Sequence, residues 1–181
     1  DAIVVAEPQE RNEAYMALTG SFEIPYKEWH TWNEKINDLS QKQRKNNIPA
    51  NIIGKRAAKE LRVDDIVNIG IGIPETVARF ARKSGMLDMI TLTVESGGIG
   101  GFPVSGEAFG AMIGAASVYD MANQFDLYDN GGLDVCFMGA LEVDKYGNIN
   151  AHRGTGAFAG IGGFANITAK TPTVVFCMTF N

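Results

Sequence analysis

The sequence is poor in the residues that hold metal ions and form disulfide bonds. Among 181 residues it has only two histidines, His30 and His152, and two cysteines, Cys136 and Cys177. Their separation along the chain matches no spacing typical of a metal site. Both cysteines lie in apolar runs, where a cysteine is usually a buried small hydrophobic residue rather than half of a disulfide. We therefore expect neither a metal site nor a disulfide.

Positive charge and long apolar runs are also scarce. The chain has 16 Lys and Arg against 21 Asp and Glu, a formal net charge of −5, whereas a nucleic-acid-binding face usually shows an excess of Lys and Arg. No apolar run reaches the roughly 18 residues that a membrane-spanning helix needs. We expect a globular protein of the cytoplasm that binds neither nucleic acid nor membrane.

The chain divides into two parts of different pattern, residues 1–48 and 49–181. The first part contains one glycine, Gly20, and both tryptophans, Trp29 and Trp32, but its apolar residues follow neither helical nor strand period for long. It is predicted to be an interdomain arm whose aromatic residues dock on another surface. The second part is predicted to form the folded, catalytic domain.

Strands and helices alternate within the second part. One helical face is marked by Ile53, Ala57 and Leu61, and a second helix is expected to begin at Pro74. Short apolar strands are expected over 65–70, 89–95, 133–140 and 171–180. The last of these is expected to be buried, and a hairpin is expected over 143–151. This alternation indicates an α/β fold with a mostly parallel open sheet flanked by helices.

Glycine is concentrated after residue 96, since 16 of the 21 glycines lie between Gly97 and Gly163. Such density indicates tight loops or a close approach of the backbone to a ligand. An earlier cluster follows the strand 65–70 and opens a helix, and it consists of Gly70, Ile71, Gly72, Ile73 and Pro74. A dinucleotide fingerprint would need another glycine where this chain has Glu75. The cluster is therefore predicted to be a loop that lines a cleft, or a tight turn that simply requires glycine.

A second cluster begins with a carboxylate, Glu95, at the end of the strand 89–95. Open α/β sheets build their sites at this edge, and a glutamate there loses solvation. A carboxylate can attack an activated thioester carbonyl, and the glycines that follow could turn N–H groups inward as an oxyanion hole. The alternative is structural, with Glu95 capping a nearby helix.

A third cluster, 154–164, suits either the passage of an extended ligand or a surface loop.

Four stretches together resemble the family I CoA-transferases, in the short-chain acyl group typified by propionate and acetate CoA-transferases. They are residues 68–78, 91–110, 124–153 and 160–168, which keep the family's order and spacing. The resemblance implies the CoA-transferase fold, of the NagB/RpiA-like type. It also implies that Glu95 is the nucleophile, because Glu95 matches the glutamate of the family's Glu-Ser/Asn-Gly motif.

The resemblance assigns further site residues and a mechanism. It places an oxyanion loop at Gly98, Ile99, Gly100 and Gly101. It places the CoA site at Gly70, Ile71, Gly72, Ile73, Pro74, Asn148, Gly162 and Gly163. The implied mechanism is ping-pong through a glutamyl-CoA thioester on Glu95. CoA would be both substrate and covalent carrier, with no permanently bound cofactor.

The resemblance also implies a partner, since complete enzymes of the family carry two similar halves. This chain would be the half that bears Glu95, expected to be incomplete at its C-terminal end. The other half, in the same chain or a separate one, would shape the acyl pocket within an oligomer. Two alternatives stay open: a CoA-binding or structural half that is inactive without its partner, and an acyl-CoA thioester hydrolase that uses Glu95 with water.

Overall fold

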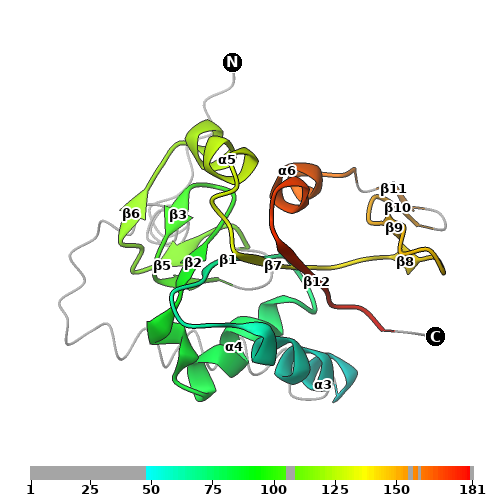
Figure 1. Cartoon of the computed structure of the whole chain (residues 1–181), viewed down its shortest axis with the longest axis horizontal. Coiled ribbons are helices and arrows are strands. Elements are labelled where there is room, and N and C mark those ends of the chain that lie inside the picture. Colours follow the sequence, from blue (N-terminus) through cyan, green and yellow to red (C-terminus); the bar gives the residue numbers. More distant parts are fainter. Residues whose placement is uncertain (1–47, 105–108, 155–156, 159, 180–181) are drawn as a thin grey trace, which may run out of the picture.

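A computed structural model describes residues 48–104, 109–154, 157–158 and 160–179 (Figure 1). The expected arm, 1–48, lies outside the described residues except for Ile48, so that prediction stays untested. None of the helices in the described ranges has the length and apolar character that crossing a membrane requires.

A six-stranded sheet forms the centre of the structure, in the order β12-β7-β1-β2-β3-β6. Its strands are β1 (Ile66–Ile69), β2 (Thr91–Thr93), β3 (Gly98–Ile99), β6 (Ser117–Val118), β7 (Val135–Met138) and β12 (Thr173–Phe176). β12, β7, β1 and β2 run parallel, whereas β3 pairs antiparallel with β2 and with β6. The expected α/β fold with a mostly parallel sheet is confirmed.

Helices cover both faces of this sheet. The α-helices are α3 (Ile48–Ala57), α4 (Glu75–Lys83), α5 (Met121–Asp129) and α6 (Phe164–Ala169), and 3-10 turns cover Ala58–Glu60 and Met86–Met89. Figure 1 shows α3 and α4 on one face and α5 and α6 on the other. In β7, Val135 and Phe137 pack with residues of α3 and α4. Cys136 and Met138, which alternate with them, pack with residues of α5 and α6.

In the described part of the chain, three antiparallel pairs lie outside the central sheet. They are β4 (Phe102–Pro103) with β5 (Met112–Ile113), β8 (Glu142–Val143) with β9 (Ile149–Asn150), and β10 (Arg153–Gly154) with β11 (Ala157–Phe158). The hairpin expected over 143–151 is confirmed by β8 and β9. Figure 1 shows β8 to β11 gathered on the side of the molecule away from β3 and β6.

Two expectations about the elements were wrong. The last strand, β12, is not fully buried, because it lies at the edge of the sheet with Thr173 exposed and the next three residues half-buried. The cluster 154–164 is not a loop throughout, because Gly154 belongs to β10, Ala157–Phe158 form β11 and α6 begins at Phe164. The helix α5 was not predicted from the sequence at all, and it contributes to the site described next.

Candidate active site

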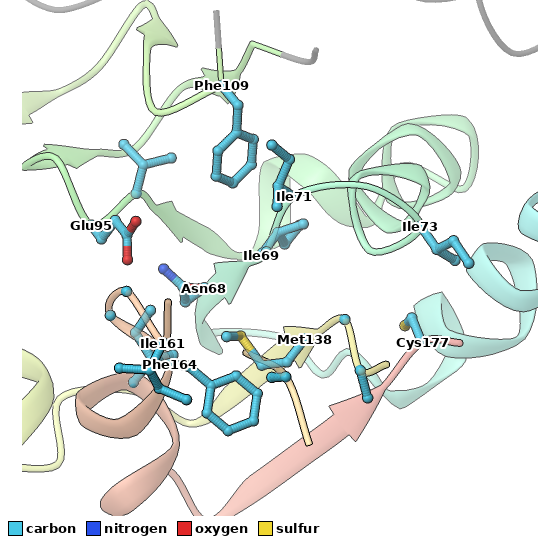
Figure 2. A pocket seen from close by; sticks show the side chains of 18 of the residues that line it. Asn68, Ile69, Ile71, Ile73, Glu95, Phe109, Met138, Ile161, Phe164 and Cys177 are labelled. Carbon is cyan, nitrogen blue, oxygen red and sulfur yellow. The ribbon is translucent and has the colours of Figure 1, made fainter. Parts of the chain in front are cut away.

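A cleft of about 480 Å³ opens at the carboxyl ends of the parallel strands (Figure 2). β1 contributes Asn68 and Ile69 to its lining, Glu95 follows β2, β7 contributes Met138, and α6 contributes Phe164. Parallel strands present their carboxyl ends at one edge, so residues far apart in the sequence meet there. The cleft therefore lies where the sequence predicted a site.

Glu95 is half-buried at this edge, two residues beyond the end of β2. None of the described residues donates a hydrogen bond to its carboxylate or forms an ion pair with it. Burial raises the pKa of Glu95 above its ordinary value, because the ionised form loses solvation. A carboxylate in this state is a stronger base and nucleophile than one in water, and it is not acting as a helix cap.

Gly163 packs directly against this carboxylate. A Cβ atom at position 163 would collide with Oε2 of Glu95 and would come within 2.7 Å of Cζ of Phe125. The backbone does not require glycine here, since φ is −78°. The requirement is one of space: any side chain at position 163 would displace Glu95 or Phe125.

The cleft brings together most of the residues predicted to bind CoA. Gly70, Ile71, Ile73, Gly162 and Gly163 all line it. Gly72 and Pro74 belong to the same turn as the first three but are not part of the lining. Their assignment to CoA stays a prediction, supported by this common location.

The turn between β1 and α4 also explains why the sequence departs from a dinucleotide fingerprint. Glu75 is buried, and its Oε1 accepts a hydrogen bond from the N–H of Gly72 at 2.7 Å. Gly72 has a φ of +88°, which suits glycine. The buried Glu75 side chain therefore stabilises the turn through its hydrogen bond to Gly72, which a glycine at position 75 could not make.

Asn148 lies outside the cleft, in the exposed β8–β9 turn. Its Nδ2 donates to Oδ2 of Asp144 at 2.7 Å, and its N–H donates to Oδ1 at 2.9 Å. In this structure the Asn148 amide therefore closes the turn, and its predicted contact with CoA stays a prediction.

The residues predicted to form the oxyanion loop also lie outside the lining of the cleft. Gly98 and Ile99 form β3, and the N–H of Gly100 donates to the carbonyl of Leu92 at 2.8 Å. Gly101 follows with a φ of +78°. The N–H of Gly100 is thus committed to the sheet, so using it as an oxyanion donor would require breaking that bond. The oxyanion role of this segment stays a prediction.

The buried thiols are poor competitors of Glu95 as nucleophiles. Cys177 lines the cleft, but burial raises its pKa to about 11, and burial likewise raises that of Cys136 to about 11. Both thiols are protonated at neutral pH, and the protonated form is unreactive. Among the described residues, His, Cys, Asp and Glu side chains nowhere gather in a group of three or more that could hold a metal ion.

Four polar residues near Glu95 were missed by the sequence analysis. Asn68 on β1, Thr93 on β2, and Gln124 and Tyr128 on α5 are buried and linked by hydrogen bonds. Asn68 could have been noticed as an amide inside an otherwise apolar strand. The spacing of Gln124 and Tyr128, at i and i+4, would have placed both on one face of a helix.

Comparison with known proteins identifies the family to which this chain belongs. A family model described as Coenzyme A transferase matches residues 50–176. The acetate CoA-transferase YdiF of Escherichia coli (strain K12) is 41% identical over 128 residues, which cover 71% of this chain and 24% of the relative. The caffeate CoA-transferase of Acetobacterium woodii is 43% identical over 135 residues, which cover 72% and 26%.

A two-subunit relative and a solved structure extend the comparison. The acetate CoA-transferase subunit beta of E. coli (strain K12) is 34% identical over 137 residues, which cover 70% of this chain and 62% of the relative. The crystal structure of the acyl-CoA transferase YdiF from E. coli O157:H7, in a thioester complex with CoA, superposes with a TM-score of 0.66. It is 37% identical and covers 73% of this chain and 26% of that chain. The chain spans about a quarter of the length of the first curated relatives. It belongs to the coenzyme A transferase family.

Proposed function

We propose that this chain supplies the nucleophile of a CoA-transferase, which moves CoA between an acyl-CoA and a carboxylic acid. The observation that carries the proposal is Glu95, a half-buried carboxylate with no described hydrogen-bond donor, beside a cleft of about 480 Å³. A carboxylate left unpaired and partly desolvated destabilises the fold, and carboxylates of this kind occur most often at functional sites. Relatives named as CoA-transferases support the same reaction class.

The proposed chemistry has two covalent intermediates on Glu95. The carboxylate attacks the thioester carbonyl of an acyl-CoA, which forms an acyl–glutamyl anhydride and releases the CoA thiolate. The thiolate attacks the glutamyl carbonyl of the anhydride, which releases the first acid and leaves a glutamyl-CoA thioester. An acceptor carboxylate then attacks this thioester, and the two steps run in reverse. The thioester complex with CoA named for the solved relative supports this scheme.

The cleft suits an uncharged, extended ligand. Among the described residues that line it, Glu95 is the only one with a formal charge at neutral pH. Its apolar lining includes Ile69, Met138 and Phe164. We infer that the pantetheine arm of CoA occupies it, and that the phosphates lie outside its described part.

The acyl pocket is proposed to come from a second half. The relative named as a subunit beta supports a two-part enzyme, and residues 1–48 would then be the arm that joins or contacts the other half. We propose an oligomer of the cytoplasm that handles short-chain acids, since two of the relatives are named for acetate.

The test is an exchange assay with the chain alone and with the acyl-binding half supplied. Acetyl-CoA is mixed with isotopically labelled acetate, propionate or caffeate, and the label in acyl-CoA and the free thiol are both measured. Transfer of CoA to the labelled acid without net thiol release is expected from the assembled halves. Thiol release without an acceptor acid would indicate a hydrolase, and CoA binding with neither reaction would indicate an inactive structural half.

A further inference from the structure

A chain of buried hydrogen bonds links α5 to the two strands beside Glu95. The hydroxyl of Tyr128 is at its centre, where it donates to Oγ1 of Thr93 at 2.9 Å. The same oxygen accepts hydrogen bonds from Nε2 of Gln124 at 2.9 Å and from Nδ2 of Asn68 at 3.2 Å. All four side chains have exposed fractions of 3% or less. Burying four polar side chains costs their solvation, and their hydrogen bonds to one another offset that cost only where every group finds a partner.

The direction of these hydrogen bonds is fixed by a backbone carbonyl. Thr93 Oγ1 donates its proton to the carbonyl oxygen of Val67 at 3.0 Å, and a carbonyl can only accept. The hydroxyl of Thr93 is therefore an acceptor toward Tyr128. Burial, and to a lesser degree the charge of Glu95, raise the pKa of Tyr128, so this phenol keeps the proton that it donates.

Because the proton of Tyr128 points to Thr93, only lone pairs of its oxygen face the two amides. Each amide must then present nitrogen to Tyr128, since an amide oxygen would meet a second acceptor. For Asn68 this places the amide nitrogen, Nδ2, toward the Tyr128 hydroxyl. Both Asn68 and Glu95 line the cleft, and Figure 2 shows the Asn68 nitrogen on the side of the Glu95 carboxylate.

This network is not arranged for stability alone. Among the described residues, none donates a hydrogen bond to Oε1 of Gln124, which is buried. A buried acceptor without a partner destabilises a fold, and apolar side chains of similar shape would avoid that loss. The polar arrangement is thus better explained by the group that it orients, which is Asn68.

Resting on the function proposed above, we propose that Tyr128 is a positioning residue for acyl transfer. Its hydroxyl, oriented by Thr93, holds the amide of Asn68 with N–H rather than oxygen toward Glu95. The negative charge that resides on Glu95, and that develops on its carbonyl oxygen when the thioester forms and breaks, then faces a donor. A flipped Asn68 would present an acceptor to that charge.

The test is a titration of Glu95 that does not depend on turnover. The full chain, assembled with the acyl-binding half, is labelled with 13C at the side-chain carboxyl of glutamate, and the Glu95 signal is assigned by its loss in Glu95→Gln. In Tyr128→Phe the Asn68 amide is free to flip, so the pKa of Glu95 is expected to rise. The matched control is Tyr146→Phe, the same change at a tyrosine that is 78% exposed, and it should leave the titration unchanged.

Other groups that titrate near Glu95 are few. Among the described residues that line the cleft, Cys177 is the only other titratable one. Tyr128, on α5, does not line the cleft but interacts with the charge of Glu95. A double-mutant cycle with Asn68→Ala separates a direct effect of the phenol from one that acts through the amide. The effect of Tyr128→Phe on the Glu95 titration should disappear when Asn68 is alanine.

Thr93→Val is a second variant, which keeps the phenol but frees its proton to turn toward a flipped Asn68. It should also raise the pKa of Glu95. Both variants should lower kcat for exchange by about tenfold while KM for acyl-CoA changes by less than about twofold. An unchanged Glu95 titration in both variants would overturn the positioning role, even if the wild type exchanges CoA. If both variants shift the Glu95 titration while the wild-type assembly exchanges no CoA, the positioning role is supported and the proposed function is rejected.

Discussion

Two carboxylates of this molecule, Glu95 at the edge of the central sheet and Asp144 in the β8–β9 hairpin, have opposite surroundings. Asp144 is fully exposed and accepts hydrogen bonds from the side chain and N–H of Asn148 and from the N–H of Tyr146. The side-chain hydrogen bond from Asn148 contributes most to lowering the pKa of Asp144. Glu95 is half-buried, has no described donor, and has its pKa raised by burial.

The difference separates a carboxylate that shapes the chain from one that is available for chemistry. The donors around Asp144 stabilise its charge, and in return that charge holds a tight turn together. Nothing comparable stabilises the charge of Glu95 among the described residues, so its ionisation opposes folding. A site that is unfavourable for the fold and favourable for nucleophilic attack is typical of an active centre.

The largest expected effect tests the two carboxylates directly. Glu95→Ala should lower CoA exchange by about 10³-fold or more, because it removes the proposed covalent nucleophile. The control is Asp144→Ala, which should keep the exchange rate. Exchange by the assembled halves is measured for both. If Glu95→Ala keeps more than about a tenth of the wild-type rate, a loss of under ~1.4 kcal/mol, Glu95 is not the nucleophile.

The next effect tests how closely Glu95 is held. Gly163→Ala should lower kcat for exchange by about 10- to 100-fold, because its Cβ would displace the Glu95 carboxylate or Phe125. Gly162→Ala is the matched control, since a Cβ there meets nothing within 4 Å. Gly162 has a φ of +55°, so its alanine variant strains the backbone by about 1–2 kcal/mol without crowding Glu95. Equal kcat losses in the two variants would show that loop strain, not crowding of Glu95, controls the rate.

A smaller effect concerns stability as a function of pH. The pKa of Glu95 is raised in the folded chain, so folded Glu95 binds its proton more tightly than unfolded Glu95 does. At neutral pH its ionisation therefore lowers stability, and Glu95→Gln should raise the free energy of unfolding. That gain should fade as the pH drops through the raised pKa, and should be absent below the ordinary value of 4.5. Urea unfolding at pH 7 and pH 4 measures it, and a variant less stable than wild type at pH 7 would contradict it.

The smallest effect concerns the hairpin. Asn148→Ala removes one hydrogen bond to Asp144, whereas Asp144→Ala removes that bond and two more from the N–H groups of Tyr146 and Asn148, so Asp144→Ala should loosen the turn more. At an exposed turn, KM for acyl-CoA should stay within about twofold of wild type in both. If KM rises about tenfold in Asn148→Ala alone, the Asn148 amide binds CoA as the family resemblance implies.

Local pattern was sufficient to predict the parallel strands, the hairpin and the position of Glu95. β-branched and apolar residues mark β1 and β2, and a carboxylate directly after such a strand is visible in the sequence. These features depend on neighbours in the chain. Gly70, Ile71 and Ile73, predicted to lie in the turn after β1, line the cleft for the same reason.

The hydrogen-bond network below Glu95 could not be predicted in this way. Asn68 and Tyr128 are 60 residues apart, and Thr93 and Tyr128 are 35 apart, so only the order of the strands brings them together. The hydrogen bond from the N–H of Gly100 to Leu92 could not be predicted either, because a run of glycines does not indicate a strand. The sequence also could not show that a side chain at position 163 would collide with Glu95, because the two residues are 68 positions apart.

The most direct measurement of the central claim is the mass of the peptide that contains Glu95 after incubation with acetyl-CoA. With the acyl-binding half present and no acceptor acid, the Glu95 peptide should carry CoA in a thioester. The adduct should disappear when an acceptor carboxylate is added, as the CoA moves to that acid. An assembly that exchanges CoA while its adduct lies on another residue, or while no covalent adduct forms, would contradict the account.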